Sequence, residues 1–400
     1  MSPVGCVGGA EQVLLASIRA ARDLIPGADL SAVLLADGPL GAEAERLGAS
    51  VIRVPLPDRL ARLGDAQRPG WGRVLGAVPG AVGFVAGLRA ALGRLAPDLI
   101  VSNGMKAHAL AAPARPRGVP VLWHLHDFPS RRPTTARLLR RLGAGVAGGI
   151  AVSDALKRDA DAAFPGLAIS VVHNAVDTDH FAPADRDGSG LDRLAGLAPA
   201  EPDTVRVGMV ATYAIWKGQE VFLDALARLP ASGPPVRGYI VGGPIYSTAG
   251  SQFTREHLER RAEANALAGR VGFIPFLSDP ADLYRMLDVA VHASTRPEPF
   301  GLAIAEAMSC GKPVVVAEAG GAAELFTPGH DGLGHTPGDA EGLASAIAAL
   351  AGDPGLRRRL GANARRTAIE RFSPDRFAGE IAAVYASCLR RPARRGLGRA

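Results

Sequence analysis

The stretch Val289–Leu325 constrains the fold of this chain more than any other. Its apolar residues fall into a strand, a helix and a second strand, expected over 289–293, 302–309 and 314–317. Gly311 and Pro313 end the helix, since neither residue favours its continuation. Two short apolar strands joined by a helix form a βαβ unit, so the stretch predicts a parallel sheet covered by helices.

The same alternation runs through the chain, whose 400 residues are enough for two or three domains. Further strands are expected over 32–36, 50–54, 98–102, 121–125, 150–152, 169–173, 205–210, 239–241 and 271–276. Helices are expected over 8–24, 340–351, 356–372 and 375–389. The predicted fold class is therefore α/β with parallel sheets.

Two carboxylates of the first stretch, Glu298 in a loop and Glu306 in the helix, stand eight residues apart. Between them, the backbone amides of Phe300, Gly301 and Leu302 mark the helix start, where anions bind readily and glycine permits close approach. Glu306 could accept hydrogen bonds from sugar hydroxyls. The arrangement suits a sugar nucleotide, although an acidic pair at this spacing, taken alone, is more often a solvated surface.

The whole run, E-P-F-G-L-A-I-A-E-A-M-S-C-G-K-P-V-V-V, resembles the E-x7-E signature of the retaining glycosyltransferases of family 4. The resemblance implies the GT-B fold, two Rossmann-like domains facing across a cleft. It also implies that Glu298 holds donor-sugar hydroxyls, that Glu306 binds the ribose, and that the amides of Phe300 to Leu302 hold the distal phosphate.

The resemblance extends to other donor-binding positions of the second domain. Lys217, one of four lysines, matches a family lysine on the donor phosphates; a surface lysine is the alternative. Thr212 stands where the family usually has an arginine, which removes one phosphate clamp. Phe276 and Leu277 match a segment whose backbone contacts the base.

In the first domain, Gly8 and Gly9 match a glycine-rich loop near the sugar, although an ordinary helix entry explains them equally well. His126, before Asp127 at the end of a strand, matches a family histidine near the anomeric carbon. The alternative is a core histidine. Asn103 also follows a strand, where it would either reach substrate or form a simple turn. We expect Lys217, Glu298 and His126 to be the catalytic residues.

The resemblance also divides the chain. It implies an N-terminal acceptor domain (1–185), a linker (186–204), a donor-nucleotide domain (205–371), a helix crossing back to the first domain (372–390) and a basic tail (391–400). Only seven residues precede Gly8, and they include Pro3 and Gly5, so the central first strand is expected to be missing. This favours a start that lies upstream, or a trimmed chain.

Charge and cysteine content bear on partners and compartment. Five arginines lie within the last eleven residues, and removing them from the net charge of +6 leaves +1, which argues against nucleic acid. Three scattered cysteines form no disulfide or metal pattern, and no signal peptide is visible, so a cytoplasmic location is expected. Five arginines within 130–142 would dock an anionic membrane face or an acidic acceptor, unless they form a solvated helix face.

These observations predict a retaining, metal-independent hexosyltransferase that uses a nucleoside diphosphate sugar as donor substrate and needs no cofactor. The acceptor is open between polysaccharide, glycolipid and small metabolite. One alternative is a non-catalytic homologue acting as a partner subunit, which Thr212 and the short N-terminus favour. The other is a sugar-nucleotide 2-epimerase, which would need further acid–base residues around the sugar.

Overall fold

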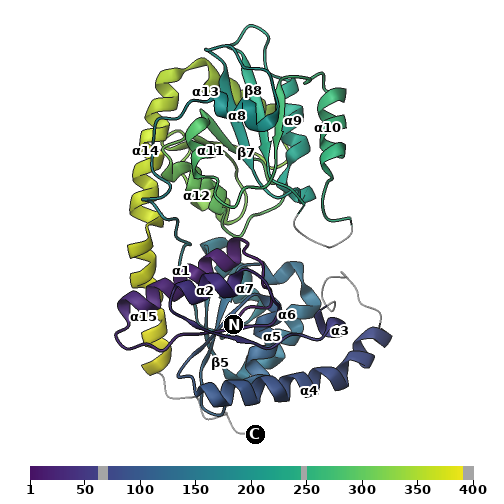
Figure 1. Ribbon diagram of the computed structural model, residues 1–400, viewed down its shortest axis with the longest axis vertical. Coiled ribbons are helices and arrows are strands. Elements are labelled where there is room, and N and C mark those ends of the chain that lie inside the picture. The colour runs from purple at the N-terminus through teal and green to yellow at the C-terminus, as the bar shows by residue number, and fades with distance from the viewer. Residues whose placement is uncertain (62–70, 245–249, 391–400) are drawn as a thin grey trace. The chain divides into compact units, whose positions relative to one another are not determined.

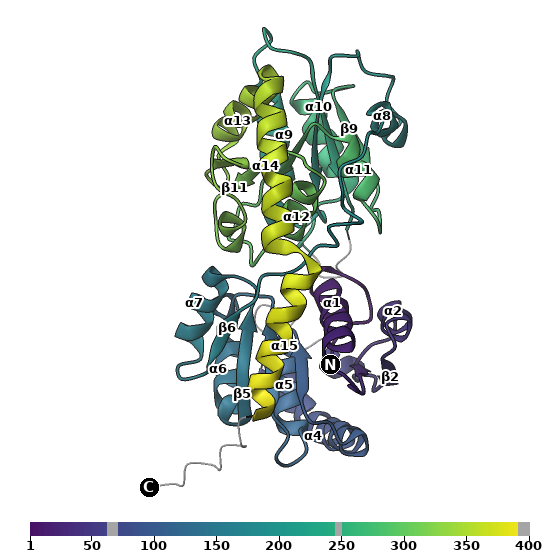
Figure 2. The same ribbon diagram turned by 90° about the vertical axis from the view of Figure 1, so that its left-hand side faces the viewer.

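The computed structural model describes residues 1–61, 71–244 and 250–390, and these form two compact units (Figures 1 and 2). Unit 1 comprises Met1–Ala175 and Pro374–Ala400, and unit 2 comprises Val176–Ser373. The expected basic tail, 391–400, lies outside the described residues. Each unit is an α/β domain built on parallel strands.

The described residues of unit 1 form six strands: β1 (Ser31–Leu34), β2 (Ser50–Arg53), β3 (Ile100–Asn103), β4 (Val121–Leu125), β5 (Val146–Ala151) and β6 (Ile169–Val171). They form a two-stranded sheet, β1-β2, and a four-stranded sheet in the order β3-β4-β5-β6, with every pair parallel. The strand expected over 121–125 is confirmed at both ends, and β4 is buried along its whole length.

Met1 and Ser2 lie between these two sheets of unit 1. The Ser2 amide donates to the carbonyl of Val33 at 3.0 Å, and the Ser2 carbonyl accepts from Leu35. On the other side, the Met1 amino group donates to Val101 at 2.7 Å, and the Met1 carbonyl accepts from Asn103 at 2.9 Å. Two residues therefore bridge the position where the sequence predicted a gap, and they connect β1 to β3.

The helices of unit 1 are α1 (Gly9–Leu24), α2 (Leu40–Arg46), α3 (Asp58–Ala61), α4 (Trp71–Leu95), α5 (Met105–Ala114), α6 (Pro133–Leu142), α7 (Asp154–Ala163) and α15 (Pro374–Arg390). The helix α15 packs along α1, as Figure 2 shows. The contact is apolar, because α1 buries Val13 and Leu14 while α15 buries Phe377 and Ile381.

Outside the gap at 245–249, unit 2 is built on a six-stranded parallel sheet in the order β12-β11-β10-β7-β8-β9. The strands are β7 (Val205–Val210), β8 (Val236–Val241), β9 (Val271–Ile274), β10 (Val289–His292), β11 (Val314–Ala317) and β12 (Gly332–His335). The chain begins in the middle at β7, runs outward through β8 and β9, then returns to β10 and runs outward the other way. This is the strand order of a Rossmann sheet, and its switch point lies between β7 and β10.

The helices of unit 2 are α8 (Ser189–Ala195), α9 (Gln219–Ala227), α10 (Arg255–Ala264), α11 (Ala281–Met286), α12 (Leu302–Ser309), α13 (Ala340–Gly352) and α14 (Pro354–Phe372). The helix expected over 302–309 is confirmed at both ends. A core of buried aliphatic and aromatic side chains, including Val207, Phe222 and Ile347, joins the sheet to its helices.

The boundary between the units differs from the expected one. Residues 176–185 belong to unit 2, and the expected linker, 186–204, contains α8. Asp192 of this helix is buried and accepts hydrogen bonds from Arg237 at 2.7 Å and Tyr239 at 2.5 Å. A buried carboxylate with these partners holds the segment against β8, so the segment is a packed part of unit 2 and not a free connection.

None of the helices in the described part of the chain combines the length and apolar character needed to cross a bilayer. Cys6, Cys310 and Cys388 are all free thiols.

Candidate active site

The centre of the candidate site in unit 2 is a pair formed by Lys217 and Glu298. Lys217 ends a short 3-10 helix after β7, and Glu298 lies in the loop after β10. Since β7 and β10 are adjacent and parallel, their carboxyl ends meet at one edge of the sheet, and the Lys217 ammonium donates to Glu298 Oε1 at 2.6 Å. The two residues expected to act on the donor therefore meet at the switch point, where ligands bind in sheets of this kind.

Glu298 is held ionised by its surroundings. Its side chain is 14% exposed and that of Lys217 23%, so water screens the pair only in part. Burial works against ionisation, but the charge of Lys217 and the ring of His292 outweigh it and hold the pKa of Glu298 well below its usual range. Ser294 also donates to Glu298 Oε2 at 2.9 Å, and His292 Nε2 lies 3.6 Å from that oxygen.

The backbone fixes the loop that carries Glu298. The Glu298 amide donates to the carbonyl of Ala319, and the Glu298 carbonyl accepts from Gly321 at 2.7 Å. At the other end of the loop, the Thr295 amide donates to the carbonyl of Trp216, next to Lys217, at 2.8 Å. The loops after β7 and β10 are thus joined by main-chain bonds, which places both charged side chains before any ligand binds.

Gly218 makes the close approach of these loops possible. Its φ is +84°, and a Cβ there would lie 1.9 Å from the carbonyl oxygen of Ala293. Only glycine fits this position, so the dipeptide Lys217-Gly218 sets the lysine against the end of β10.

The three residues expected to offer amides begin α12. Gly301 caps this helix with φ +116°, no side chain caps it, and its first turn carries no acidic residue. The amides at this end point out of the helix, where a phosphate is favoured. The Phe300 side chain is buried against Phe372, which leaves its backbone as the group it could offer to a ligand, and Leu302 is the first helical residue.

Thr212, Phe276 and Leu277 line one small pocket of about 80 Å³ at the ends of β7, β8 and β9. Phe276 is 55% exposed, although it is a large apolar side chain. Gln219 Nε2 donates to the Thr212 carbonyl at 2.7 Å, while Thr212 Oγ1 and Gln219 Oε1 are buried without a hydrogen-bond partner among the described residues. The structure therefore brings these three expected donor-binding residues together.

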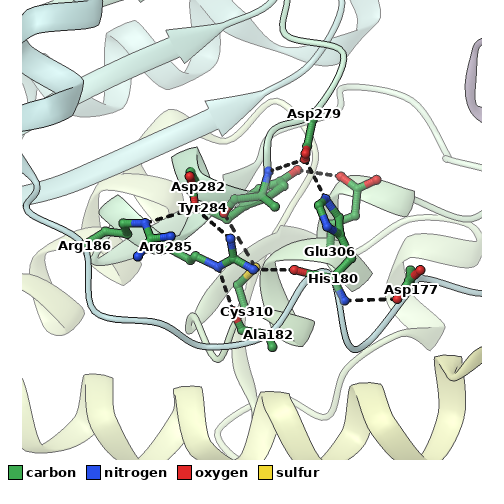
Figure 3. A network of polar contacts seen from close by, with 11 residues as sticks. Asp177, His180, Ala182, Arg186, Asp279, Asp282, Tyr284, Arg285, Glu306 and Cys310 are labelled. Atoms are coloured by element: carbon green, nitrogen blue, oxygen red, sulfur yellow. Dashed lines mark hydrogen bonds and ion pairs between the residues drawn. The ribbon is translucent and has the colours of Figure 1, made fainter.

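Glu306 belongs to a second network, drawn in Figure 3. Glu306 is a residue of α12, and its side chain accepts a hydrogen bond from the Tyr284 hydroxyl of α11 at 3.0 Å. Burial raises the pKa of Glu306 to about 7, nearby Asp279 adds to the rise, and the Tyr284 hydrogen bond opposes it. Glu306 is thus half-protonated near neutrality, in contrast to Glu298.

The segment that enters unit 2 is fixed beside this second network. His180 is hydrogen-bonded to Asp279 at 2.9 Å, and Arg285 donates to the carbonyls of Ala182, at 2.8 Å, and of His180 (Figure 3). These contacts explain why residues 176–185 fold with unit 2.

In unit 1, Gly8 and Gly9 begin α1. The Gly8 amide donates to the Glu11 carboxylate at 3.2 Å, an arrangement that satisfies an amide at a helix start. The structure shows this helix-entry role for Gly8, and Gly9 is exposed beside it. A role in sugar binding stays a prediction.

His126, the expected catalytic histidine, follows β4 and is partly exposed. Its Nε2 lies 2.6 Å from Oδ1 of Asn103, which ends β3, and its ring lies 4.4 Å from that of His124. Desolvation, and then the neighbouring His124 and His108, hold the pKa of His126 well below its usual range. The ring is therefore neutral near pH 7 and can accept or donate a hydrogen bond.

Sequence reasoning did not single out Ser294, His292 or Tyr284. Ser294 and His292 could have been found, because they stand at the carboxyl end of the strand that precedes Glu298. Tyr284 gave no such signal, since it meets Glu306 from a helix that the sequence pattern did not predict.

Comparison with known proteins identifies the family of this chain. The family described as Glycosyltransferase Family 4 matches residues 7–180, and the one described as Glycosyl transferases group 1 matches residues 198–367. The crystal structure of Anabaena Alr3699/HepE in complex with UDP-glucose is 30% identical, with a TM-score of 0.78 over 96% of this chain and 98% of that chain. The chain belongs to glycosyltransferase family 4, and its fold class is that of the GT-B glycosyltransferases.

Curated relatives match over a shorter segment. A D-inositol 3-phosphate glycosyltransferase of Streptomyces bingchenggensis (strain BCW-1) is 35% identical over 228 residues, 56% of this chain and 48% of the relative. The lipopolysaccharide core biosynthesis mannosyltransferase LpsB of Rhizobium meliloti (strain 1021) is 32% identical over 57% of this chain and 64% of LpsB. The matched segment spans about half the length of the first relative.

Proposed function

We propose that this chain is a retaining glycosyltransferase of the hexosyltransferase type, which moves a sugar from a nucleoside diphosphate sugar to a hydroxylated acceptor without a metal ion. The observation that carries the proposal is the Lys217–Glu298 pair at the switch point of unit 2, fixed by the backbone bonds of both loops. Retention is proposed because the run from Glu298 to Glu306 resembles the E-x7-E signature of retaining enzymes. The acceptor is proposed as a polysaccharide, a glycolipid or a small metabolite.

Each site residue has a role in this proposal. Lys217 and the amides of Phe300, Gly301 and Leu302 neutralise the charge that grows on the diphosphate as its bond to the anomeric carbon breaks. Glu298 accepts hydrogen bonds from the donor-sugar hydroxyls. When a donor phosphate accepts a hydrogen bond from the Lys217 ammonium in place of Glu298 Oε1, that oxygen becomes available to the sugar hydroxyls.

The nucleoside would lie between the pocket and the second network. Glu306 binds the ribose hydroxyls, and Thr212, Phe276 and Leu277 surround the base. In unit 1, we propose His126 as the residue that acts near the anomeric carbon, and Gly8 and Gly9 as further sugar-binding residues. We propose uridine as the first base to test, because the solved structure of Alr3699/HepE contains UDP-glucose.

A donor panel tests this proposal. UDP-, GDP-, ADP- and TDP-sugars are incubated with the protein in the presence of a chelator, and release of the nucleoside diphosphate is measured. Release from one donor class without added metal supports the proposal, and the configuration of a transferred product tests retention. Binding of a donor without any release would favour the non-catalytic homologue, for which Thr212 in place of arginine is the specific observation. Conversion of the donor to an epimer would favour the 2-epimerase.

We further propose that unit 1 contacts an anionic membrane surface through α6. Arg137, Arg140 and Arg141 of this helix are exposed, and so are Arg131 and Arg132 just before it. Five exposed guanidinium groups with no acidic residue between 128 and 153 form a basic face, and such faces bind anionic lipid head groups.

Vesicle co-sedimentation tests the membrane contact. Wild-type protein is expected to bind phosphatidylglycerol vesicles at low salt but not phosphatidylcholine vesicles. Arg137→Glu/Arg141→Glu should abolish binding, whereas Arg358→Glu/Arg359→Glu, an exposed pair on α14, should not. Equal binding of vesicles by both variants would contradict the proposal. If the protein bound an acidic glycan but not vesicles, these arginines would instead bind an acidic acceptor.

A further inference from the structure

The amide of Asn103 has only one orientation that satisfies both of its contacts. Asn103 is 1% exposed, and its Nδ2 lies 3.2 Å from the carbonyl oxygen of Ala10 in the first turn of α1. A carbonyl oxygen only accepts hydrogen bonds, so the amide nitrogen must face Ala10. The amide oxygen, Oδ1, must then face the ring of His126.

This orientation fixes the tautomer of His126. Because Oδ1 of Asn103 is an acceptor, Nε2 of His126, 2.6 Å away, must carry the hydrogen. In a neutral imidazole the other nitrogen, Nδ1, then carries the lone pair. A chain of two hydrogen bonds thus runs from the backbone of α1 to one defined state of the histidine.

We propose that Asn103 is a positioning residue: it holds His126 in the Nε2–H tautomer, so that Nδ1 is presented as a hydrogen-bond acceptor to a hydroxyl of the sugar substrate. The inference rests on the proposed function, which places His126 at the reacting end of the donor. It also explains why a buried asparagine ends β3.

The surroundings of Asn103 support positioning over direct contact with substrate. Its backbone amide donates to the Met1 carbonyl at 2.9 Å, and both polar atoms of its side chain are occupied by Ala10 and His126. On the other side, the His126 ring lies against that of His124, with the ring centroids 4.4 Å apart and the planes tilted by 32°. The hydrogen bond to Asn103 and the packing against His124 together fix the orientation of the His126 ring before substrate binds. A group that is oriented in advance can act on a substrate without a further loss of freedom.

The tautomer is measured by NMR on histidine-labelled full-length protein, in the absence of substrate. The chain has nine histidines, and His126→Gln assigns the signal. We expect His126 Nδ1 to have a pyridine-type nitrogen shift and Nε2 a pyrrole-type shift. The opposite pattern, or a mixture of both tautomers in the wild-type protein, would overturn the inference.

Three variants then test the effect on turnover of UDP-glucose. Asn103→Leu removes the acceptor, and we expect kcat to fall at least about tenfold, with the donor KM within about twofold. Asn103→Asp retains an acceptor for Nε2–H but loses the donor to Ala10, so kcat should fall less than in Asn103→Leu; its charge should raise the pKa of His126 and move the acid limb of the pH–rate profile to higher pH.

Ser102→Ala is the matched control, because Ser102 is also buried in β3 but bonds to His108 at 2.8 Å. It should leave the His126 tautomer and kcat unchanged. If Asn103→Leu matches Ser102→Ala in both readouts, Asn103 only packs and the inference fails. A wild-type protein that neither binds nor turns over UDP-glucose contradicts the choice of donor or the proposed function, while the tautomer still decides whether Asn103 positions His126.

Discussion

The two units place their candidate residues at equivalent edges of parallel sheets, but the residues are charged in unit 2 and neutral in unit 1. In unit 2, Lys217 and Glu298 form an ion pair, whereas in unit 1 Asn103 and His126 form a neutral pair. Both pairs connect neighbouring parallel strands at their carboxyl ends. The strand order therefore determines where the side chains meet, and their partners determine whether they are charged.

The difference follows from the nearest neighbours of each group. Glu298 is poorly hydrated, yet the ammonium beside it favours ionisation. His108 and His124 are buried with no acidic partner in the part of the chain that the structure describes, and desolvation lowers their pKa values to about 3 and about 4. A charged site suits a diphosphate, and a neutral site suits sugar hydroxyls.

The largest effect is expected from removing the cation of unit 2. Lys217→Ala should lower kcat/KM for UDP-glucose by at least about a hundredfold, the size of the loss of one preorganised charge contact. Lys157→Ala, which removes a lysine from a surface pair with Asp161, should keep the wild-type value. Initial rates of UDP release measure both, and a Lys217→Ala enzyme within threefold of wild type would refute the charged-site assignment.

The stability of unit 1 should fall more in acid than that of unit 2. Histidines of the unfolded chain bind a proton near pH 6.5, whereas buried His108 and His124 stay neutral. Each of them therefore lowers the free energy of unfolding of unit 1 as the pH falls below that value, by about 2 kcal/mol at pH 5. Hydrogen exchange, corrected for intrinsic rates, should show protection of β3 and β4 falling between pH 7.5 and pH 5 by at least about thirtyfold, which is the loss expected from one of the two histidines alone.

Unit 2 should respond less to the same change. The depressed pKa of His335 acts in the same direction as the histidines of unit 1, but protonation of Glu306, whose pKa is about 7, relieves a buried charge and offsets it. If β7 and β10 lost as much exchange protection as β3 and β4 over the same pH range, the contrast between the units would be wrong.

Glu306 should also make nucleotide binding depend on pH. In the proposed function, ribose hydroxyls donate to the ionised carboxylate of Glu306, which is depleted as the pH falls through about 7. The affinity for UDP should therefore fall about tenfold from pH 8 to pH 6. Calorimetry on wild type and Glu306→Gln tests this, since the variant should bind weakly at both pH values and show no such slope.

The smallest effect concerns Ser294, which donates to Glu298 Oε2 at 2.9 Å. Ser294→Ala removes one hydrogen bond but leaves the Lys217 contact, so turnover should fall about fivefold, or about 1 kcal/mol. A loss as large as that of Lys217→Ala would mean that the serine, and not the lysine, fixes the carboxylate.

Much of the fold could be predicted because its strands are short apolar runs between turn residues. The strands over 121–125, 205–210 and 314–317 and the helix over 302–309 have the predicted ends. The strand β12, Gly332–His335, was not predicted, because its two glycines give it little apolar pattern. The helix α8 was taken for a linker, since it lies among glycines and prolines and is held by the tertiary contacts of Asp192.

The candidate site was predictable where it lies in one stretch of sequence and not where it depends on distant contacts. The neighbours of Glu298 and Lys217 follow from strand order. The contact of Tyr284 with Glu306, and the raised pKa that burial gives this carboxyl, follow from packing between α11 and α12. The bridging of β1 and β3 by Met1 and Ser2 likewise rests on backbone bonds that no sequence pattern indicates.

Calorimetric titration with UDP and UDP-glucose tests the central claim most directly, because it separates the proposed phosphate contact of Lys217 from the proposed sugar contact of Glu298. The account predicts that Lys217→Ala weakens both ligands, whereas Glu298→Gln leaves UDP bound as in wild type and removes only the added affinity of the glucose. If both variants bind both ligands as wild type does, the switch point of unit 2 is not the donor site.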